Sequence, residues 1–301
     1  MPANFDNVHI IINPAAGKNE PVLNTLNKIF NTHFHNWEVS ITHQKGDGQR
    51  LAQNAIHNGA DLVIAYGGDG TAMDVANGVM GHHVPLGILP GGTGNALAAE
   101  MGIPRDLKKA AEMICSGRWR THIVDVGRIG DQIFLLRADM GTTEEVIGAT
   151  DRDAKNRYGM IAYVVSAVKA MLNPKVSQYR MVFDGMDVQC EGLACLIANM
   201  GTVGTLDLSL SKSVDPTDGM LDVFVFSKDH FKNMRSIITN IVADLVHLRD
   251  LEASMLHFQT KEITVSVSDE LSVSIDGEPI TRTPVTASVV PQALQLVVPH
   301  E

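Results

Sequence analysis

The stretch that decides the fold is residues 62–71, which read Leu-Val-Ile-Ala-Tyr-Gly-Gly-Asp-Gly-Thr. Its first four residues form a short apolar run that predicts a β-strand. The run leads almost directly into a glycine-rich turn, and a helical pattern over residues 73–80 follows the turn. A strand, a tight turn and a helix in this order form the repeating unit of a parallel sheet that is covered by helices.

The same unit recurs on both sides of this stretch. Helical spacing of apolar residues predicts a helix over residues 19–31 and another through Leu51, Ala52 and Ile56. Strands are expected at residues 8–12, 37–42, 62–65 and 86–89. The sequence therefore predicts an α/β domain with a parallel sheet and right-handed crossovers.

The pattern changes after Trp119, where one strand candidate follows another. Two helical patterns, at residues 158–172 and 230–248, interrupt a series that is typical of an antiparallel sandwich. We expect a first domain at residues 1–120 and a second domain at residues 121–301, whose last strand packs back near the cleft. The strand candidates are residues 122–129, 132–137, 176–183, 188–198, 221–226, 257–259, 263–267, 271–275 and 294–298.

Composition and charge exclude several classes of protein. The chain has 301 residues, 45% of them hydrophobic and 19% charged, which suits a folded protein rather than a disordered one. Its net charge of −10 and the lack of a basic stripe argue against nucleic acid as a partner. The three cysteines show no metal-type pairing, the N-terminus lacks a signal-peptide pattern, and the apolar windows are shorter than the ~20 residues that span a bilayer. We expect a cytoplasmic protein.

Three of the predicted strands end in turns of a phosphate-binding type. Glycine lets a ligand approach the backbone, and the helix that follows offers free N–H groups to an anion. One such turn is often only structural, but three turns on the same edge of a sheet favour a ligand site. The chain has no Walker-type loop and no dinucleotide fingerprint after the first strand. The candidate residues of this ligand site are Asn13, Gly17, Gly67, Gly68, Asp69, Gly70, Thr71, Gly92, Thr93 and Asn95. Asp69 is also a candidate catalytic residue.

Asp69 is the one charged residue within these turns that repels phosphate. A bridging Mg²⁺ or an ordering hydrogen bond would reconcile the carboxylate with an anionic ligand. The sequence leaves both explanations open.

The motifs Asn13-Pro-Ala-Ala-Gly17, Gly67-Gly-Asp-Gly-Thr71 and Leu89-Pro-Gly-Gly-Thr-Gly-Asn95 occur in this order, followed by Asp215-Pro-Thr-Asp-Gly-Met-Leu-Asp222 and Ile275-Asp-Gly-Glu-Pro279. Together they resemble the diacylglycerol kinase catalytic-domain family, which includes bacterial lipid kinases and sphingosine kinases. The resemblance covers nearly the whole chain.

The resemblance implies a two-domain, ATP-dependent lipid kinase with its active site between the domains. It implies an N-terminal domain like that of NAD kinases and phosphofructokinases, and a C-terminal β-sandwich. By position, Thr42 and Thr93 resemble nucleotide-contacting threonines, and residues 68–74, Asp74 included, resemble the nucleotide loop. Asp218, with backbone carbonyls near Asp215 and Met220, resembles a structural Mg²⁺ site. Asp276 and Glu278 fall on the catalytic Asp-Gly-Glu segment.

Two positions depart from the family pattern. The nucleotide loop usually continues Thr-x-Asn-Glu, but this chain has Met73 and Asp74 there. Many bacterial members have Asp at the position of Ala96. With Ala at this position, the chain is closer to the sphingosine kinase pattern. These departures affect the identity of the lipid more than the chemistry.

The residues alone leave some roles open. Two close carboxylates at Asp276 and Glu278 could supply a proton acceptor, but Asp-Gly is also a common hairpin turn with an exposed Glu after it. Residues 215–219 likewise form a good turn signature without any metal.

The leading hypothesis is a lipid kinase that uses ATP and Mg²⁺ and phosphorylates a hydroxyl of a diacylglycerol-like lipid at a membrane surface. The protein would attach to the membrane transiently and could form a homodimer. Alternatives are a sphingoid-base, ceramide or phosphatidylglycerol kinase, an NAD kinase, and a nucleotide-binding regulator without catalysis.

Overall fold

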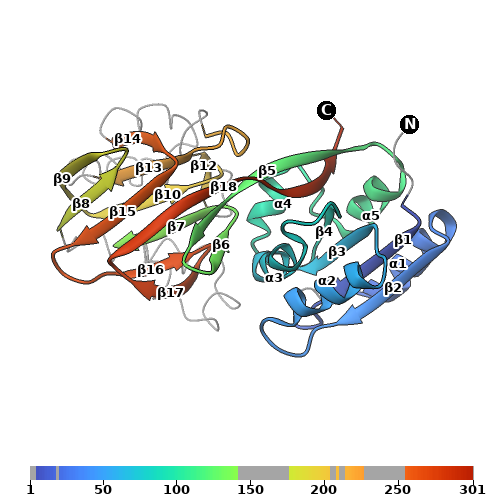
Figure 1. Ribbon diagram of the computed structural model, residues 1–301. Helices are drawn as coiled ribbons and strands as arrows, with labels where there is room; N and C mark the ends of the chain where they lie inside the picture. The colour runs from blue at the N-terminus through green and yellow to red at the C-terminus, as the bar shows by residue number, and fades with distance from the viewer. Residues whose placement is uncertain are drawn as a thin grey trace, which may run out of the picture. The chain divides into compact units, whose positions relative to one another are not determined.

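A computed structural model describes residues 5–17, 20–141, 176–203, 208–209, 214–226 and 255–300 (Figure 1). The chain divides into two compact units. Unit 1 contains Met1–Val126, Met200–Gly219 and Val290–Glu301, and unit 2 contains Gly127–Asn199 and Met220–Val289. The helices expected at residues 158–172 and 230–248 lie outside the described residues.

Unit 1 is built on a parallel sheet in the order β2-β1-β3-β4, with the end of β18 beside β4. Every residue of β3 and β4 is buried, as expected for central parallel strands. The strands are β1 (Asn7–Ile12), β2 (Asn36–Ile41), β3 (Leu62–Gly67), β4 (Leu86–Pro90) and β18 (Val285–Pro299), and a small ribbon pairs β11 (Thr202–Val203) with β12 (Leu208–Ser209).

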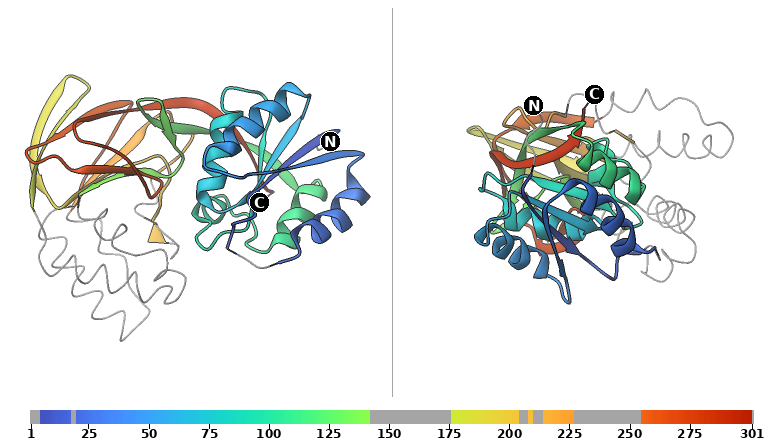
Figure 2. Two further views of the ribbon diagram at one scale, coloured as in Figure 1. Left: turned by 90° about the horizontal axis from the view of Figure 1, so that it is seen from below. Right: turned by 90° about the vertical axis from the view of Figure 1, so that its right-hand side faces the viewer.

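Helices cover both faces of this sheet (Figure 2). α1 packs against α5, and α2 packs against α3. Phe30 of α1 is fully buried and meets Phe34 and Trp37 edge to face, which fixes the turn into β2. The helices are α1 (Val22–His33), α2 (Asp47–His57), α3 (Asp69–Val79), α4 (Ala96–Glu100) and α5 (Leu107–Cys115).

The strand order reverses between β1 and β3. The chain leaves β1 toward β2 on one side, and it leaves β3 toward β4 on the other side. In open parallel sheets, the carboxyl ends of strands at such a reversal are where ligands bind. The topology therefore places the turns after β1 and β3 at the expected binding edge.

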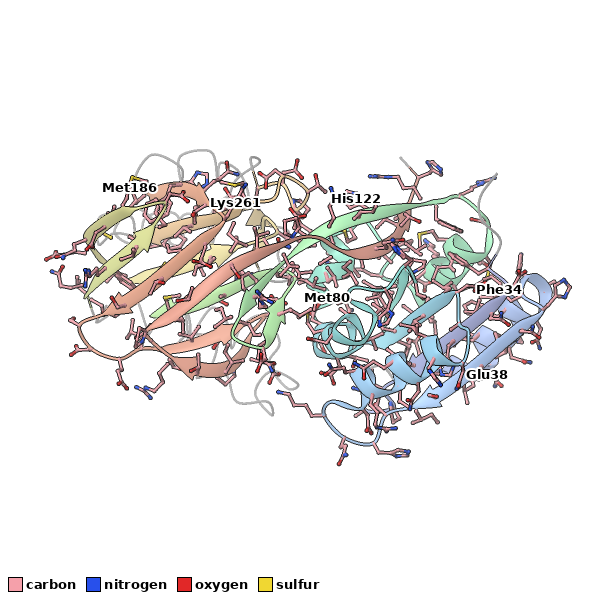
Figure 3. The ribbon with its side chains drawn as sticks, in the orientation of Figure 1. Phe34, Glu38, Met80, His122, Met186 and Lys261 are labelled. Carbon is pink, nitrogen blue, oxygen red and sulfur yellow. The ribbon has the colours of Figure 1, made fainter. Side chains whose placement is uncertain are left out.

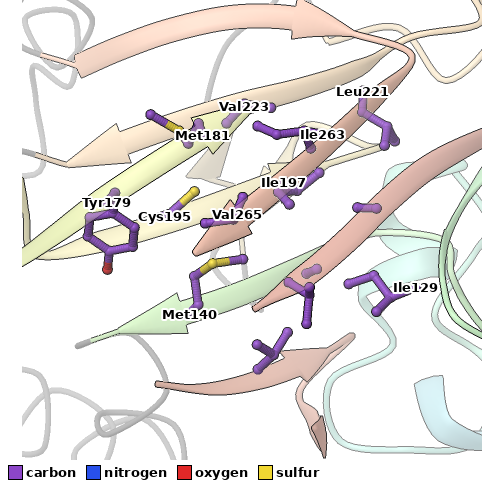
Figure 4. Packing of buried hydrophobic residues seen from close by; sticks show 14 of the residues in the cluster. Ile129, Met140, Tyr179, Met181, Cys195, Ile197, Leu221, Val223, Ile263 and Val265 are labelled. Atoms are coloured by element: carbon purple, nitrogen blue, oxygen red, sulfur yellow. The ribbon is translucent and has the colours of Figure 1, made fainter. Parts of the chain in front are cut away.

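Unit 2 is a sandwich of two antiparallel sheets, in the orders β18-β15-β8-β9 and β14-β13-β10-β7-β16-β17. Its core is formed between the sheets by side chains such as Met181, Ile263, Val223 and Met140 (Figure 4). The chain enters unit 2 within β5 (Trp119–Ile129), whose residues up to Val126 belong to unit 1. The other strands are β6 (Gln132–Phe134), β7 (Arg137–Gly141), β8 (Ser177–Phe183), β9 (Met186–Gly192), β10 (Ala194–Ala198), β13 (Leu221–Phe226), β14 (Met255–Thr260), β15 (Glu262–Val267), β16 (Ser272–Ile275) and β17 (Glu278–Arg282).

The expected fold class, a parallel α/β domain followed by a β-sandwich, is confirmed. Two single strands predicted from sequence are wrong in detail. The run at 188–198 is two strands in different sheets, since the chain turns at Gly192, where a Cβ would lie 2.6 Å from Val225. The run at 132–137 breaks at residues 135–136, whose backbone N–H groups donate to the carboxylate of Asp276 and not to a neighbouring strand. Helices α4 and α5, strand β17 and the first half of β18 were not expected.

Candidate active site

Asn13 joins two of the glycine-rich turns across the reversal of the sheet. It follows β1, and its Nδ2 donates to Oγ1 of Thr71 at 2.9 Å, in the first turn of α3. Its backbone N–H donates to the carbonyl of Tyr66 at 3.0 Å, and its Oδ1 accepts from the N–H of Ala15 at 2.9 Å. The turns after β1 and β3 are therefore held together by one side chain.

Close contacts between glycines join the turns after β3 and β4. The N–H groups of Gly91 and Gly92 donate to the carbonyl of Gly67 at 2.8 and 3.2 Å. A Cβ on Gly92 would lie 2.5 Å from the Cα of Gly68, and a Cβ on Gly67 would overlap the side chain of Thr71. These positions admit only glycine, and the two backbones lie against each other as a result.

Asn95 shapes the turn that leads into α4. It adopts a left-handed backbone with φ of 53°, and its buried side chain accepts from the N–H of Gly92 at 3.0 Å and donates to the carbonyl of Gly92 at 2.7 Å. Thr93 is exposed between these residues. A Cβ on Gly17 would lie 3.4 Å from Oγ1 of Thr93, so the turn after β1 approaches this turn as well.

Asp69 is the first residue of α3, and its carboxylate is partly exposed. Its Oδ1 accepts a hydrogen bond of 3.1 Å from the N–H of Leu97 in α4. The positive end of the α3 dipole also favours a negative charge at this position. The hydrogen bond from Leu97 therefore orders this carboxylate.

The loop after β2 carries Thr42 and is fixed by two carboxylates. The N–H of Thr42 donates to the carbonyl of Ile12 at 2.9 Å, and the N–H of Gly46 donates to Oδ2 of Asp74 at 3.0 Å. Buried Asp47 accepts from Arg50 and from the N–H groups of His43 and Gln44 at 2.8 to 3.1 Å. Arg50 and these N–H groups lower the pKa of Asp47 to about 2.

A second acidic turn lies at residues 215–219. Oδ1 of Asp215 accepts from the N–H and the hydroxyl of Thr217 at 2.9 and 2.6 Å, which is the geometry of a self-contained turn. Asp218 is exposed and follows in the same turn.

Sequence reasoning missed Asp125, a buried residue of β5 that organises this second turn. Its Oδ2 accepts from the N–H of Gly219 and its Oδ1 from the N–H of Gln292, both at 2.7 Å. Its own N–H donates to the carbonyl of Pro216 at 2.7 Å. A lone Asp in the apolar run of residues 122–129 is the signal that could have found it.

Asp276 and Gly277 form the tip of the β16–β17 hairpin in unit 2. Both have positive φ, 47° and 87°, which is the two-residue hairpin turn that Asp-Gly favours. The carboxylate of Asp276 accepts three backbone hydrogen bonds, from Leu135, Leu136 and Arg137, at 2.8 to 3.0 Å. Burial raises the pKa of Asp276 to about 6, although these N–H groups act in the opposite direction. Glu278 begins β17 and is exposed.

The structure therefore gathers the predicted residues in three places. The first place is the expected binding edge of unit 1, where α3 begins with Asp69 and Gly70 and where Thr42 lies on the neighbouring loop, which Asp74 of α3 bonds. The other residues that meet there are Asn13, Gly17, Gly67, Gly68, Thr71, Gly92, Thr93 and Asn95. Asp215 and Asp218 share a separate turn of unit 1, and Met220 follows it in the chain. Asp276 and Glu278 belong to the hairpin of unit 2.

Two grooves are present on the described part of unit 1. One has a volume of about 420 Å³, borders Asn13 and has apolar walls that include Ile12, Leu23 and Ile41. The other, of about 300 Å³, lies beside His122 of β5 (Figure 3) and contains none of the predicted residues. The turn after β1 therefore lies beside an accessible groove with apolar walls.

The described residues contain neither a ready-made metal centre nor a membrane-spanning helix. Among them, no three His, Cys, Asp or Glu side chains gather closely enough to hold a metal. The turn at 215–220 offers only oxygen donors, which is the chemistry that Mg²⁺ prefers when water completes its shell. None of the helices described is long and apolar enough to cross a membrane.

Family models match both parts of the chain. Residues 7–129 match the diacylglycerol kinase catalytic domain, and residues 140–298 match the YegS C-terminal NAD kinase beta sandwich-like domain.

Individual proteins agree with these matches. "Uncharacterized protein sll0036" of Synechocystis is 28% identical over 97% of this chain and 70% of its own length. "Putative lipid kinase SaurJH9_0749" of Staphylococcus aureus is 29% identical over 86% of this chain and 85% of its own length. A crystal structure described as a putative diacylglycerol kinase from Bacillus anthracis is 26% identical, with a TM-score of 0.84 over 98% of this chain and 96% of that one.

Proposed function

Since this chain belongs to the diacylglycerol kinase catalytic-domain family, we propose that it is an ATP-dependent lipid kinase that transfers the γ-phosphate to a hydroxyl of a diacylglycerol-like lipid. Phosphoryl transfer needs few covalent steps from the protein, because positioning and charge stabilisation supply most of the rate.

The joined turns of unit 1 are the observation that carries this proposal. Asn13 bonds Thr71 across the reversal of the sheet, and Gly68 and Gly92 touch where any side chain would intrude. The result is a glycine-lined backbone surface at the start of α3, where N–H groups and the helix dipole favour a polyphosphate. A purely structural turn does not require three strands to end in this way.

The proposed nucleotide site uses the residues around these turns. The residues that would line the phosphates are Asn13, Gly17, Gly67, Gly68, Gly70, Thr71, Gly92, Thr93 and Asn95. Thr42 and Asp74 would contact the nucleotide from the loop after β2, which Asp47 holds in place. Because Asp69 has a charge that repels phosphate, its role would be to orient a cation bound to the nucleotide.

Mg²⁺ is part of the proposal. Asp69 would hold the ion that accompanies ATP, and Asp215, Asp218 and the carbonyl of Met220 would hold a structural ion. When bound beside ATP, Mg²⁺ neutralises charge on the phosphates. Asp125 fixes the backbone of the 215–219 turn through Gly219 and Pro216, and so keeps its oxygens in place.

The Asp-Gly-Glu segment of unit 2 is the proposed source of the group that accepts the proton of the lipid hydroxyl. Asp276 and Glu278 are its two carboxylates, and they differ in their surroundings. Asp276 is bonded to backbone N–H groups, whereas Glu278 is exposed at the start of β17.

The lipid and the cellular location are the finer parts of the proposal. The relative from Staphylococcus aureus is named for lipids in general, and the Bacillus anthracis structure is described for diacylglycerol. We propose a diacylglycerol-like substrate that is reached from the cytoplasm by transient attachment to a membrane. Homodimer formation also belongs to the proposal, and no nucleic acid partner is proposed.

The proposal is tested by incubating the purified protein with labelled ATP, Mg²⁺ and a panel of acceptors in vesicles. The panel contains diacylglycerols, sphingoid bases, ceramides and phosphatidylglycerol, with NAD as a soluble acceptor. We expect labelled phosphate on a diacylglycerol. Label on a sphingoid base, ceramide or phosphatidylglycerol would correct the substrate, label on NAD alone would replace the proposal, and ATP binding without transfer would indicate a regulator.

A further inference from the structure

The second groove of unit 1, of about 300 Å³, is lined by basic side chains, and we call it the basic groove. Arg120 and His122 lie two residues apart in β5, so they share one face of that strand. β5 pairs with β18 (Figure 1), and His300 directly follows the end of β18. The backbone N–H of His300 donates to the carbonyl of Arg118 at 3.1 Å, which keeps His300 beside the start of β5. Basic residues from distant parts of the sequence therefore line one groove.

A hydrogen bond between Arg120 and His122 fixes the protonation of the histidine ring. Nη1 of Arg120 lies 3.4 Å from Nδ1 of His122, and a guanidinium can only donate, so Nδ1 accepts. Burial lowers the pKa of His122, and the charge of Arg120 lowers it further. The ring is therefore neutral at neutral pH and has its proton on Nε2, which makes Nε2 a hydrogen-bond donor.

Carboxylates also lie near these residues, and they are bonded to donors that do not line the groove. Asp215 acts on His122 and raises its pKa, against the two larger effects. Oδ1 of Asp215 accepts from the N–H and the hydroxyl of Thr217. Oε1 of Glu100, at the end of α4, accepts from the N–H of Gly201 at 3.3 Å. The protein itself thus supplies hydrogen bonds to both carboxylates.

We propose that the basic groove binds a phosphate monoester group, at a site separate from the glycine-rich turns. A guanidinium has five N–H donors in a planar fork, so Arg120 can bond His122 and an anion at the same time. The Nε2 proton of His122 and the ring of His300 add further donors. The volume lies at the lower limit of small-molecule sites, which suits a phosphate and the first atoms of its ester.

The charge of the whole chain makes local donors decisive. The net charge is −10, so the molecule in general repels anions. An anion that binds in the basic groove is selected by the side chains that line it. A phosphate monoester has three acceptor oxygens, enough for Arg120, His122 and His300 together, whereas a carboxylate has two.

Two kinds of molecule carry this group. One is a soluble phosphate ester, and the other is a lipid whose head group is a phosphate monoester. The kinase reaction proposed above makes the second kind, but the inference does not rest on that reaction.

The test follows histidine ring resonances of the full chain by NMR while glycerol 3-phosphate is added. A chelator is present, so that no divalent ion bridges the phosphate to Asp215. The ring resonances report on the basic groove, because His122 and His300 line it and the glycine-rich turns contain no histidine. His122→Ala and His300→Ala identify the two resonances. We expect both to shift and to saturate.

Arg120→Gln should weaken this binding at least about tenfold, since a hydrogen bond to a charged group is worth that much. The matched control is Arg118→Gln, which removes the same charge two residues earlier. Its side chain does not line the groove, and its carbonyl still accepts from His300. We expect Arg118→Gln to bind glycerol 3-phosphate as the wild type does.

Equal losses in Arg120→Gln and Arg118→Gln would overturn the inference, because binding would then follow general charge. Ring resonances that do not respond to about 10 mM glycerol 3-phosphate would overturn it as well. Should Arg120→Gln not fold, His122→Ala takes its place, followed at the resonance of His300, and an unchanged affinity in that variant overturns the inference.

A vesicle measurement distinguishes the two sources of the phosphate. Sedimentation is compared between vesicles of phosphatidylcholine alone and vesicles of about nine parts phosphatidylcholine to one part phosphatidic acid. Binding to the second kind only, lost in Arg120→Gln and kept in Arg118→Gln, supports the groove as a site for a lipid head group. Response to glycerol 3-phosphate without such binding supports a soluble ester. None of these measurements uses kinase activity, so a failure of the proposed function would leave the result standing.

Discussion

The Asp-Gly pairs at Asp69-Gly70 and Asp276-Gly277 use these residues in opposite ways. At Asp69 and Gly70, the neighbouring glycines make the close contacts, and the carboxylate accepts a hydrogen bond from Leu97. At Asp276 and Gly277, the glycine has open space around it, and the carboxylate accepts three backbone hydrogen bonds. The first turn is held by the backbone, and the second turn is held by the carboxylate.

This difference shows that a carboxylate in a kinase motif is not identified as reactive by its position in the sequence. A carboxylate held by several N–H groups gives stability and a fixed geometry. A carboxylate that contributes little to its own turn, and that lies where phosphate is expected, can instead orient a cation bound to that phosphate. On this criterion we expect Asp69 to take part in the proposed chemistry and Asp276 to stabilise its own hairpin.

The largest expected effect is that of Asp69→Asn. The amide oxygen can still accept from the N–H of Leu97, so we expect the melting temperature to change by less than about 2 °C. Loss of the charge that orients the nucleotide's cation should lower kcat/KM on the order of 10³-fold, which corresponds to about 4 kcal/mol. Steady-state kinetics and a thermal melt on the same preparation check both parts.

Asp276→Asn is the natural comparison for this variant, because the same atom is replaced in the other turn. It should lose stability as well as activity. Equal effects of the two variants on the melting temperature would remove the distinction between the turns.

Gly92→Ala tests the backbone-held turn directly. Its Cβ would meet the Cα of Gly68 at 2.5 Å, and neither backbone can move without disturbing a buried strand. Overpacking of this kind typically costs ~1–3 kcal/mol, and we expect the KM for ATP to rise together with a lower melting temperature.

The matched control is Gly277→Asn in the other turn. It has nothing within 4 Å of a new Cβ, and its φ of 87° is tolerated by Asn better than by other side chains. We expect a cost below about 1 kcal/mol. A larger loss for Gly277→Asn than for Gly92→Ala would mean that contacts do not hold the first turn.

Most of the fold follows from local sequence patterns. The alternation of apolar runs and glycine-rich turns up to residue 117 predicted the parallel sheet. Each strand, turn and helix of that region can be recognised from its own residues. The breaks at 135–136 and at Gly192 could not be seen in this way. They depend on Asp276 and on the packing of Val225, both of which are distant in the sequence.

The site was predictable to a similar extent. Glycine spacing and order indicated the turns of unit 1, but not the bond between Asn13 and Thr71 that joins them. The role of Asp125 could not be predicted, since it acts on Gly219 and Gln292, which are distant in the sequence. The Asp-Gly hairpin was one of two open interpretations, and its three N–H partners are visible only in the structure.

Asp218→Ala examines another Asp-Gly pair, in the turn that Asp125 holds. If Mg²⁺ binds there, the ion stabilises the folded state by mass action, about 1.4 kcal/mol at ten times its dissociation constant. We expect the wild type to melt a few degrees higher with Mg²⁺ than with a chelator, and the variant to lose part of that difference. ATP affinity should change little.

A melting curve of the wild type that is indifferent to Mg²⁺ would contradict a structural ion at this turn. In that case Asp218 would belong with Asp276, as a carboxylate that serves its own turn. The turn would then be fixed by Asp125 alone.

The smallest effect is expected for Asp47→Asn, and it extends the comparison to a carboxylate of unit 1 that is bonded as fully as Asp276. Arg50 and the N–H groups of His43 and Gln44 lower the pKa of Asp47 to about 2, below its value in the unfolded chain. A lowered pKa means that the stabilisation is fully present above about pH 4 and is lost as the pH falls toward 2. Urea unfolding should therefore show a constant difference between wild type and variant from pH 7 to pH 5, and a shrinking difference below pH 4. Asp131→Asn, in the exposed turn between β5 and β6, serves as the control for the same substitution at the surface. A difference for Asp47→Asn that stays constant down to pH 2 would mean that the charge of Asp47 does not hold the loop that carries Thr42.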